Sequence, residues 1–458
     1  MTHTMLARSI RILVAVVIVA GCSDPTVPAN ELAIQAARVT STGPTVKSAL
    51  PSNAPQNVTL DVTISGSGFE PGSAAKWLLN GVEDARVKTN ATTFISSTSL
   101  VANITIAEDA VPSLYDIAVI TPQGKKGIGT EKFTVLPMVE LAAPDSTSRA
   151  NDINSSGYIV GNRAGGCNAG VLPVLWPNEE MWIDLPIPAG FCAAAAVKIA
   201  DNGAVLGYVR TASATSYYHI VLWTPTESGY VSQVLREFPN PVEIDDMNAV
   251  GHFVGSYLNN GYRDSFWWSV ETGFVDLTEP AGMQSCYVSG VNDHDEISGS
   301  CHGGPLNATY WASPYSTPEI LPRLSGTTAG YLGHAINNLG VIVGYGSIGT
   351  QKGQTVNTTL RWSKGAAGWN LEDLGSIGGQ PIPNVVNDLG WIAGSDVPKG
   401  GTRHAVLWRP DRGMQDLGVT GVESYAWGMN NPASANAIRV VGMSNRKGNW
   451  RAVVWTPQ

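Results

Sequence analysis

The sequence predicts an all-β protein in which a small immunoglobulin-like sandwich precedes a seven-bladed β-propeller. Two observations predict the propeller: a phrase built on a tight turn recurs seven times, and a Trp recurs at one place in each repeat. A third, the alternation of apolar residues over 46–136, predicts the sandwich. With 458 residues, 43% of them hydrophobic, the chain is too long for one ordinary domain and too apolar to be disordered.

The first repeated phrase is an apolar residue, Asn, a two-residue turn, Gly, and a short apolar strand that ends in Gly. The copies are INSSGYIVG (153–161), IADNGAVLG (199–207), MNAVGHFVG (247–255), VNDHDEISG (291–299), INNLGVIVG (336–344), VNDLGWIAG (386–394) and a copy from Met429 to Gly442 with an insertion. Asn or Asp beside Gly suits the backbone of a tight hairpin. There are seven copies, and the number of residues from each copy to the next falls among the repeat lengths of propellers.

A second phrase holds the repeated Trp, and a third ends in Asp-Leu. The Trp positions are 176, 223, 268, 311, 362, 408 and 455. Each repeat therefore offers four short strands, written a to d, with the tight turn between a and b and the Trp on c. Four antiparallel strands are the composition of a propeller blade. The fixed position of the Trp favours packing between blades over sugar stacking.

The ends of the array predict how the propeller closes. The seventh repeat stops at Trp455-Thr456-Pro457-Gln458, before a strand d, and Met138 to Leu141 resembles a strand d without a repeat. We expect this segment to complete the seventh blade, which would make residues 138–458 a closed propeller without exposed edges.

The segment 46–136 carries period-two runs such as Asn57 to Ser65 and fits an immunoglobulin-like sandwich. Its turn Gly66-Ser67-Gly68-Phe69-Glu70-Pro71-Gly72, with SSTSLVANI (96–104) and LYDIAVITPQG (114–124), resembles the IPT/TIG family. The resemblance implies a spacer or interaction module.

The first 22 residues predict export. Arg8 and Arg11 precede an aliphatic run, and Val19-Ala20-Gly21-Cys22 resembles the lipobox of bacterial lipoproteins, which implies lipidation of Cys22. An ordinary secretory signal with a chance Cys is the alternative. Residues 23–45 are predicted to be a flexible tether. The expected location is the bacterial outer membrane or the cell surface.

The repeats around Arg403-His404-Ala405-Val406-Leu407-Trp408 resemble the HAF repeats of bacterial extracellular proteins, although only His219 and His404 occupy the His position. The resemblance implies a secreted, propeller-like array and no particular activity.

Four Cys follow Cys22: Cys167, Cys192, Cys286 and Cys301. An even number in an exported chain predicts two disulfides. Cys286 and Cys301 flank the a–b turn of the fourth repeat symmetrically, which predicts a cross-strand bridge. Cys167 and Cys192 lie in loops that share one face of a propeller. Four free thiols are the alternative.

Catalytic and cofactor motifs such as H-E-x-x-H, C-x-x-C, a Walker loop and G-x-S-x-G are absent from the sequence, so we expect no cofactor. The cluster Asn292 to Glu296 could hold a cation, but a hairpin turn explains its composition, and no metal site is predicted. With 28 basic and 37 acidic residues, a nucleic-acid partner is not expected.

A ligand would meet the position three residues before the repeated Asn, near the channel entrance that the d–a and b–c loops frame in propellers. Its occupants are Asn151, Val197, Asp245, Ser289, His334, Asn384 and Trp427. The candidate ligand contacts are Asp245, His334, Asn384 and Trp427, with Lys352 from the long b–c loop 345–357. The alternative is that these side chains only cap strand ends.

The sequence favours a lipid-anchored binding protein for a polymer or protein ligand, attached to the membrane through its lipid and monomeric. The main alternative is a polysaccharide lyase or glycosidase in the funnel, for which Asp245 with His334 is the one pair to nominate. A structural part of an envelope assembly is a third hypothesis.

Overall fold

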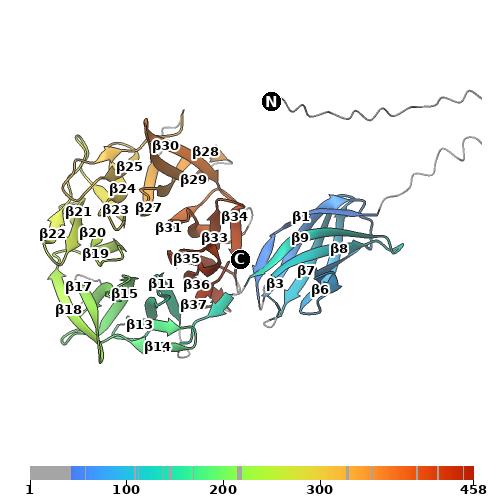
Figure 1. Cartoon of the computed structure of the whole chain (residues 1–458), viewed down its shortest axis with the longest axis horizontal. Helices are drawn as coiled ribbons and strands as arrows, with labels where there is room; N and C mark the ends of the chain where they lie inside the picture. The colour runs from blue at the N-terminus through green and yellow to red at the C-terminus, as the bar shows by residue number, and fades with distance from the viewer. Residues whose placement is uncertain are drawn as a thin grey trace, which may run out of the picture. The chain divides into compact units, whose positions relative to one another are not determined.

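The computed structural model describes residues 43–457 except 57, 108–109, 112, 137, 144–146, 169, 214–218, 326–329, 352–353, 399–400, 420–421 and 447. Cys22 and most of the predicted tether lie outside the described residues. Within the described part, every regular element is a β-strand apart from one 3-10 turn, η1 (Ala435–Ala437) (Figure 1). No helix among these residues has the length and hydrophobicity to span a bilayer.

Residues 45–136 form two sheets around one core. One sheet has the order β1-β3-β7-β6 and the other β2-β9-β8-β4-β5, with β2 parallel to β9. The strands are β1 (Thr45–Leu50), β2 (Asn53–Pro55), β3 (Val58–Ser67), β4 (Ala74–Leu79), β5 (Val82–Glu83), β6 (Val87–Ser96), β7 (Ser99–Ile106), β8 (Ser113–Ile120) and β9 (Lys126–Leu136). Both sheets contribute to the core, for example Ile104 from β7 and Trp77 from β4. Burial alternates along β7, as the period-two pattern predicts.

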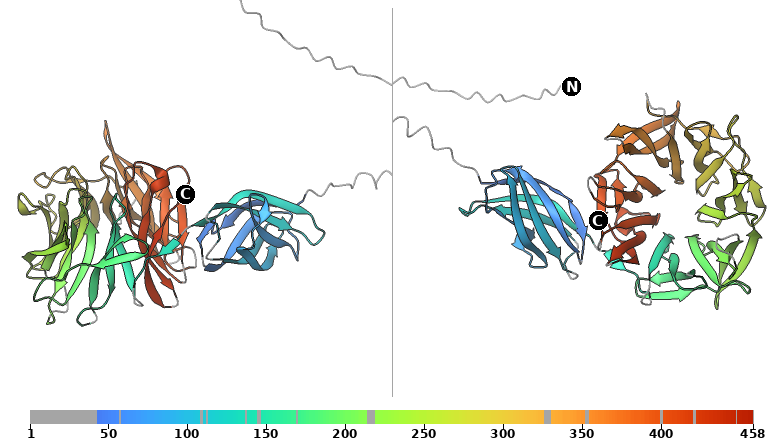
Figure 2. Two further views of the ribbon diagram at one scale, coloured as in Figure 1. Left: turned by 60° about the horizontal axis from the view of Figure 1, so that its bottom comes forward. Right: turned by 180° about the vertical axis from the view of Figure 1, so that it is seen from behind.

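Residues 138–455 form seven four-stranded antiparallel sheets, which Figures 1 and 2 show as blades arranged in a ring. Blades 1 to 3 are β11 (Ser148–Ile153), β12 (Ile159–Ala164), β13 (Val171–Asn178), β14 (Met181–Asp184); β15 (Ala193–Ile199), β16 (Val205–Arg210), β17 (His219–Thr226), β18 (Gly229–Glu237); and β19 (Val242–Met247), β20 (Phe253–Asn259), β21 (Tyr262–Ser269), β22 (Gly273–Asp276). Blades 4 and 5 are β23 (Cys286–Val291), β24 (Ile297–His302), β25 (Leu306–Trp311), β26 (Glu319–Ile320); and β27 (Tyr331–Ile336), β28 (Ile342–Gln351), β29 (Gln354–Gly365), β30 (Gly368–Gly375). Blades 6 and 7 are β31 (Ile382–Val386), β32 (Ile392–Asp396), β33 (His404–Arg409), β34 (Gly413–Gly418); and β35 (Ser424–Met429), β36 (Val440–Arg446), β37 (Asn449–Trp455), β10 (Met138–Glu140).

The seventh blade closes as predicted. Strand β10 pairs antiparallel with β37, with Met138 opposite Trp455 and Glu140 opposite Val453. The backbone N–H of Leu141 continues the pairing by donating to the carbonyl of Ala452 at 2.9 Å. A segment that precedes the first blade thus supplies the outer strand of the last one, and the edge of β37 is covered.

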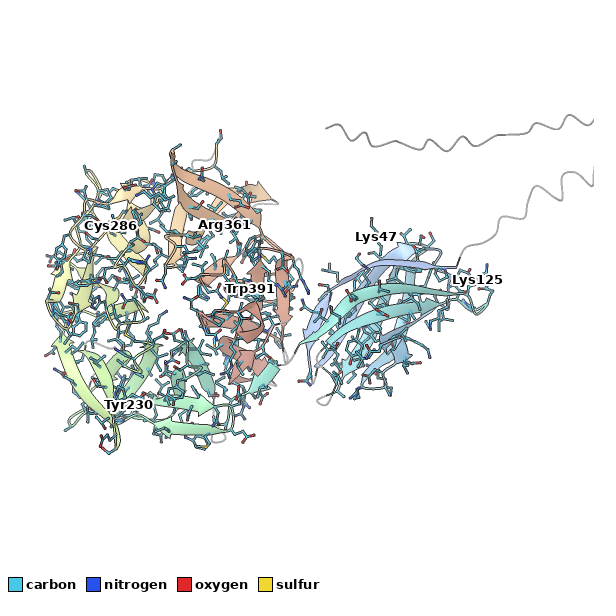
Figure 3. The ribbon with its side chains drawn as sticks, viewed as in Figure 1. Lys47, Lys125, Tyr230, Cys286, Arg361 and Trp391 are labelled. Atoms are coloured by element: carbon cyan, nitrogen blue, oxygen red, sulfur yellow. A yellow bond between two sulfur atoms is a disulfide. The ribbon has the colours of Figure 1, made fainter. Side chains whose placement is uncertain are left out.

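The repeated Trp residues join neighbouring blades, as predicted. Six of the seven are buried and Trp408 is partly buried. The indole N–H of Trp223 in blade 2 donates to the carbonyl of Pro186, just after the outer strand of blade 1, at 2.7 Å. The same bond links Trp311 to Thr278, Trp362 to Pro322 and, across the closure, Trp176 to Ala142. A buried indole N–H usually has such a partner, and in these four blades the connector of the preceding blade provides it, whereas the buried Nε1 of Trp455 has none. The side chains in Figure 3 occupy the spaces between blades.

Both predicted disulfides are present. Cys167 is bonded to Cys192, and Cys286 is bonded to Cys301 across β23 and β24. Cys286 is labelled on blade 4 in Figure 3. Disulfides form and persist in oxidising compartments, so the two bridges indicate an extracytoplasmic protein.

The segment 345–357 was expected to be a long b–c loop, and this expectation is wrong. Strands β28 and β29 continue into it and pair as far as Gln351 with Gln354. The alternation of small and β-branched residues here suits a hairpin extended beyond the blade. Lys352, a predicted ligand contact, lies outside the described residues.

Candidate functional site in the central channel

Each inner strand carries a β-bulge at the position that the sequence singled out. The strand a to strand b register shifts there in every blade, for example between Ala150 and Asp152, so that one residue is left without a partner. The unpaired residues are Asn151, Val197, Asp245, Ser289, His334, Asn384 and Trp427. The bulge explains why the residue type at this position varies from blade to blade, while the position two residues later is always apolar. The bulge residue takes no part in the strand pairing, so the pairing does not restrict its side chain.

The residue that follows the bulge faces the channel, and its chemistry differs between two sides of the channel. In blades 1 to 3 it is Asp152, Lys198 or Asp246, and all three line the channel pocket. In blades 4 to 7 it is Gly290, Ala335, Val385 or Gly428. A Cβ at Gly428 would lie 2.9 Å from the Cα of Asp152, so glycine here allows blades 7 and 1 to approach closely. One side of the channel is charged, and the other is small and apolar at the same level.

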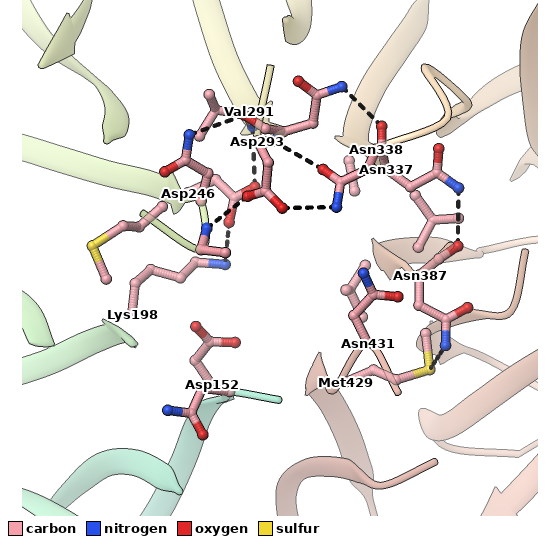
Figure 4. Close-up of a pocket in the computed structure, with 18 of the residues that line it drawn as sticks. Asp152, Lys198, Asp246, Val291, Asp293, Asn337, Asn338, Asn387, Met429 and Asn431 are labelled. Carbon is pink, nitrogen blue, oxygen red and sulfur yellow. Dashed lines mark hydrogen bonds and ion pairs between the residues drawn. The ribbon is translucent and has the colours of Figure 1, made fainter. Parts of the chain in front are cut away.

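The charged side is held by hydrogen bonds between blades (Figure 4). The Lys198 Nζ lies 2.9 Å from Oδ1 of Asp246, in the next blade. Oδ2 of Asp246 accepts the backbone N–H of Val291 at 3.1 Å, and Oδ2 of Asp152 accepts that of Ile199 at 3.0 Å. Both carboxylates therefore fix the next blade as well as line the channel.

Burial changes the proton affinities on this side. Burial raises the pKa of Asp152 to about 6, and the Lys198 ammonium partly opposes the change. The pKa of Lys198 is raised: burial acts against the charged form, but the carboxylates of Asp246 and Asp152 outweigh it. Lys198 is therefore a permanent cation between two carboxylates.

Asp245, a predicted ligand contact, is a bulge residue with a buried, unpartnered Oδ2. Burial first, and then the charge of Glu243, raise its pKa from 3.8 to about 8. Between about pH 4 and 8 the folded protein therefore holds a proton on Asp245 that the unfolded chain has already released. As a result, the contribution of this group to the stability of the fold is greatest at low pH and is lost as pH rises to about 8.

We expect Asp245→Asn to raise the free energy of unfolding at pH 9 by on the order of 2 kcal/mol, because an amide buries no charge. At pH 3.5 the variant and the parent should be equally stable, since Asp245 is then neutral in both states. Urea unfolding followed by Trp fluorescence at several pH values measures this. Equal stability at pH 9 would show that burial does not raise the pKa of Asp245.

The mouth of the channel pocket lies at the a–b turns, not at the d–a and b–c loops that the sequence analysis expected. Its lining comes from all seven blades, and the cavity has a volume of about 150 Å³. The residue after the repeated Asn forms the rim, with carboxylates at Asp201, Asp293 and Asp388.

The repeated Asn residues form a belt beneath the rim. In each, the side-chain carbonyl accepts backbone N–H groups of its own turn, as Asn248 does from His252 at 2.9 Å. The side-chain amide then donates to the next blade: Asn248 to Asn292 at 3.0 Å, Asn292 to Asn337 at 2.9 Å and Asn337 to Asn387 at 2.9 Å. The repeat phrase thus specifies a contact between blades in addition to a turn.

The belt changes where the repeat phrase departs from its pattern. In blade 2 Ala200 offers no amide, and the backbone N–H of Asp201 donates to the carbonyl of Ala249 instead, at 3.1 Å. In blade 7 the Asn430 amide donates within its own insertion, to Ala437 at 3.0 Å. Arg439 crosses from that insertion to blade 1, where it pairs with Glu179.

The predicted ligand contacts are only partly brought together. Asn384 and Trp427 line the channel pocket, opposite the charged side. The Asn384 amide donates to the carbonyl of Ala426 at 2.7 Å, while the buried Nε1 of Trp427 has no hydrogen-bond partner. Asp245 and His334 occupy bulges two blades apart and are not among the lining residues, and burial lowers the pKa of His334 to about 4. None of these assignments is tested by the structure, and they stay predictions.

Sequence reasoning missed Asp152, Lys198 and Asp246. The sequence does contain a pattern that marks these three residues: the position two residues before the repeated Asn is charged only in the first three copies. The cluster Asn292 to Glu296 serves the fold here, since Asp295 accepts from the ring of His252 at 2.9 Å and from the indole of Trp267 at 3.0 Å. Among the described residues there is no group of three or more side chains arranged to hold a metal ion.

Comparisons with known proteins show similarity of this chain to solved structures, but no similarity to a sequence family. No family model matches the sequence, and no curated protein does. TolB from Acinetobacter baumannii is 12% identical over 72% of this chain and 90% of its own, with a TM-score of 0.38. The β-propeller domain of the Trilobed protease from Pyrococcus furiosus is 9% identical over 83% of this chain and 97% of its own, also at 0.38. A lectin from Aleuria aurantia, solved with Fucα1-6GlcNAc, is 11% identical over 60% of this chain and 97% of its own, at 0.35. All three are too distant to assign a function, and the assignment of a propeller rests on the seven sheets themselves.

Proposed function

We propose that this chain is a non-enzymatic, extracytoplasmic binding protein whose propeller holds its ligand at the a–b mouth of the central channel. One observation carries the proposal: a pocket of the described residues is lined by all seven blades and has a charged side formed by Asp152, Lys198 and Asp246. A concave site with a few convergent polar groups is the usual form of a ligand pocket.

The charges of the lining favour a ligand with a cationic group. Among the described lining residues there are five carboxylates, Asp152, Asp201, Asp246, Asp293 and Asp388, and one ammonium, Lys198. Field lines from like charges concentrate in a cleft and draw in the opposite charge. The Trp427 ring is already covered by the Arg149 guanidinium, 4.3 Å from its centre, and by Tyr425, which stacks on it at 5.6 Å. The carboxylates of the lining would therefore make the contacts with an amino sugar or another polar ammonium compound.

The hydrogen bonds of the carboxylates support binding over catalysis. A glycosidase needs two carboxyl groups that are free to exchange protons or attack the substrate. Here Asp152 and Asp246 each accept a backbone N–H of the next blade, and Asp246 also pairs with Lys198. Protonation of either would loosen the joint between two blades, which makes them poor participants in turnover.

We infer that the propeller is displayed at the cell surface. The two disulfides support export, the lipobox-like Val19 to Cys22 supports a lipid anchor, and residues 23–45 supply a tether. The two-sheet segment 46–136 would act as an immunoglobulin-like spacer of the IPT/TIG kind, and the HAF-like repeats agree with an extracellular array.

Binding of the glucosamine hexamer, compared with its neutral N-acetylated counterpart, tests this function. Isothermal titration of the full chain in detergent should show binding of the cationic hexamer, with affinity that falls as salt is added. The double variant Asp201→Asn/Asp246→Asn keeps the side-chain acceptors and should weaken binding at least tenfold.

Glu227→Gln is the matched control, because Glu227 is exposed on the c–d turn of blade 2 and should leave the affinity unchanged. Equal binding by the double variant would place the ligand elsewhere. Shortened hexamer in the mass spectrum of the mixture would contradict a pure binding role and favour the glycosidase hypothesis.

A further inference from the structure

A groove between blades 3 and 4 lies at the opposite end of the blades from the channel mouth. It is bordered by the b–c hairpins of both blades and by the connector from strand d of blade 3 to strand a of blade 4. The groove has a cavity volume of about 440 Å³, within the range of about 300–1,000 Å³ usual for ligand sites. Nothing in the channel site accounts for it.

The groove presents an aromatic ring to solvent. Tyr262 is 50% exposed and lines the groove immediately after a tight hairpin turn. The two turn residues, Asn260 and Gly261, have φ of 48° and 86°, the backbone of a two-residue hairpin that only Asn and Gly adopt readily. The turn fixes where β21 begins, and therefore where the ring of Tyr262 stands.

A second ring in the groove is held by charge. The Arg263 guanidinium lies 5.0 Å from the centre of the Tyr287 ring and is paired with Glu243. The imidazole of His302 lies 5.6 Å from the same ring. Tyr287 is thus positioned before any ligand arrives, which reduces the conformational entropy lost on binding.

The polar groups that line the groove are neutral amides and hydroxyls with one imidazole. Ser285 accepts the backbone N–H of Arg263 at 3.0 Å, which leaves its hydroxyl hydrogen to donate, and the amide of Gln284 is exposed. Of the described residues that line the groove, none is an acid, a lysine or an arginine. The remaining lining is glycine, including Gly282 and Gly304 at φ of 82° and 101°, where side chains would be strained.

The disulfide makes this arrangement rigid. Cys286 follows Ser285 and precedes Tyr287, and Cys301 precedes His302. The bridge between them ties the two strands directly behind the groove. The comparable hollow between blades 5 and 6 differs: its Tyr345 packs against His334 at 5.4 Å, and Arg403 lines it.

We propose that the groove between blades 3 and 4 is a second binding site, for a neutral saccharide. A sugar ring carries an apolar C–H face that stacks on an exposed aromatic ring, and hydroxyls that exchange hydrogen bonds with amides, hydroxyls and imidazole. The lack of charged lining residues disfavours acidic and cationic sugars, because neither would find a counter-charge to offset its lost hydration. This site is independent of the channel site.

Titration of the full chain with neutral hexasaccharides (N-acetylated chitohexaose, cellohexaose, maltohexaose and mannohexaose) tests the proposal, with oligogalacturonate as the acidic comparison. At least one neutral hexamer should bind and oligogalacturonate should not. Tyr262→Ala should weaken the neutral binding at least tenfold, and Tyr262→Trp should preserve it, since the larger ring still stacks.

Tyr315→Ala is the control, because Tyr315 is 66% exposed on the same blade pair but does not line the groove. The channel variant Asp201→Asn/Asp246→Asn should also bind the neutral hexamer normally, so failure of the channel proposal is distinguished from failure of this one. The proposal is overturned if no neutral hexamer binds, if Tyr262→Ala binds as the parent does, or if oligogalacturonate binds equally well.

Discussion

Met138→Asp is expected to lower the free energy of unfolding of the propeller by about 3–5 kcal/mol, the cost of an unpaired charge in a protein interior. Met138 is 8% exposed and packs in a cluster with Trp455, Leu407 and Ile438. A carboxylate there would separate β10 from the seventh blade and expose the edge of β37. Urea unfolding monitored by Trp fluorescence should show an earlier transition.

Val139→Asp is the matched control for this variant. Val139 belongs to the same strand but is 41% exposed, because successive side chains of a strand point to opposite faces. Its substitution should cost less than about 1 kcal/mol. If both variants unfold like the parent, closure of the propeller by β10 makes no contribution to stability.

Lys198→Met is expected to cost about 3–5 kcal/mol at pH 8, because it removes one partner of a buried ion pair. The Lys198 and Asp246 side chains are 17% and 22% exposed, and Asp152 lies on the same side of the channel. Without the ammonium, two carboxylates share a site that lacks a counter-charge. The deficit should shrink as pH falls below about 6, the pKa of Asp152, where that carboxylate takes up a proton.

The double variant Lys198→Met/Asp246→Asn should recover most of this loss. The amide oxygen of Asn keeps the acceptor for the N–H of Val291, and no unpaired charge remains at that position. Lys364→Met is the comparison on the surface, where Lys364 and Glu319 are both 49% exposed at 3.4 Å, and should change stability by less than about 1 kcal/mol. If Lys364→Met lowered the free energy of unfolding as much as Lys198→Met does, the ion pair in the channel would stabilise the fold no more than a surface ion pair does.

The repeat phrases predicted the propeller well because they record contacts that recur from blade to blade. In most blades the Asn of the turn also bonds to the next blade, and in four blades the indole N–H of the strand c Trp bonds to the connector of the preceding blade. The closing strand was predictable for a related reason, since a blade without its outer strand leaves unpaired backbone groups. Such requirements repeat, so they can be read from spacing alone.

The channel could not be predicted in the same way, because its chemistry lies where the repeats differ. The residue type at the bulge position varies from repeat to repeat, and this variation marks the position in the sequence. The direction in which each bulge side chain points depends on the local backbone, which the sequence does not specify. Asp245 and His334 proved to be buried beside the channel pocket, while the neighbouring Lys198 and Asp246 line it. A difference of one residue along a strand reverses the side chain's direction, and spacing does not resolve that at a bulge.

The closure of blade 7 also sets an order for folding. Strand β10 is synthesised before any other strand of the propeller, yet its partner β37 comes last, and Met138 meets Trp455 only when the whole array has been made. The side-chain amide of Asn292 likewise waits for blade 5 to supply its acceptor. Contacts so distant in sequence form slowly. A nascent chain therefore carries an incomplete array in which β10 has no partner until β37 has been made.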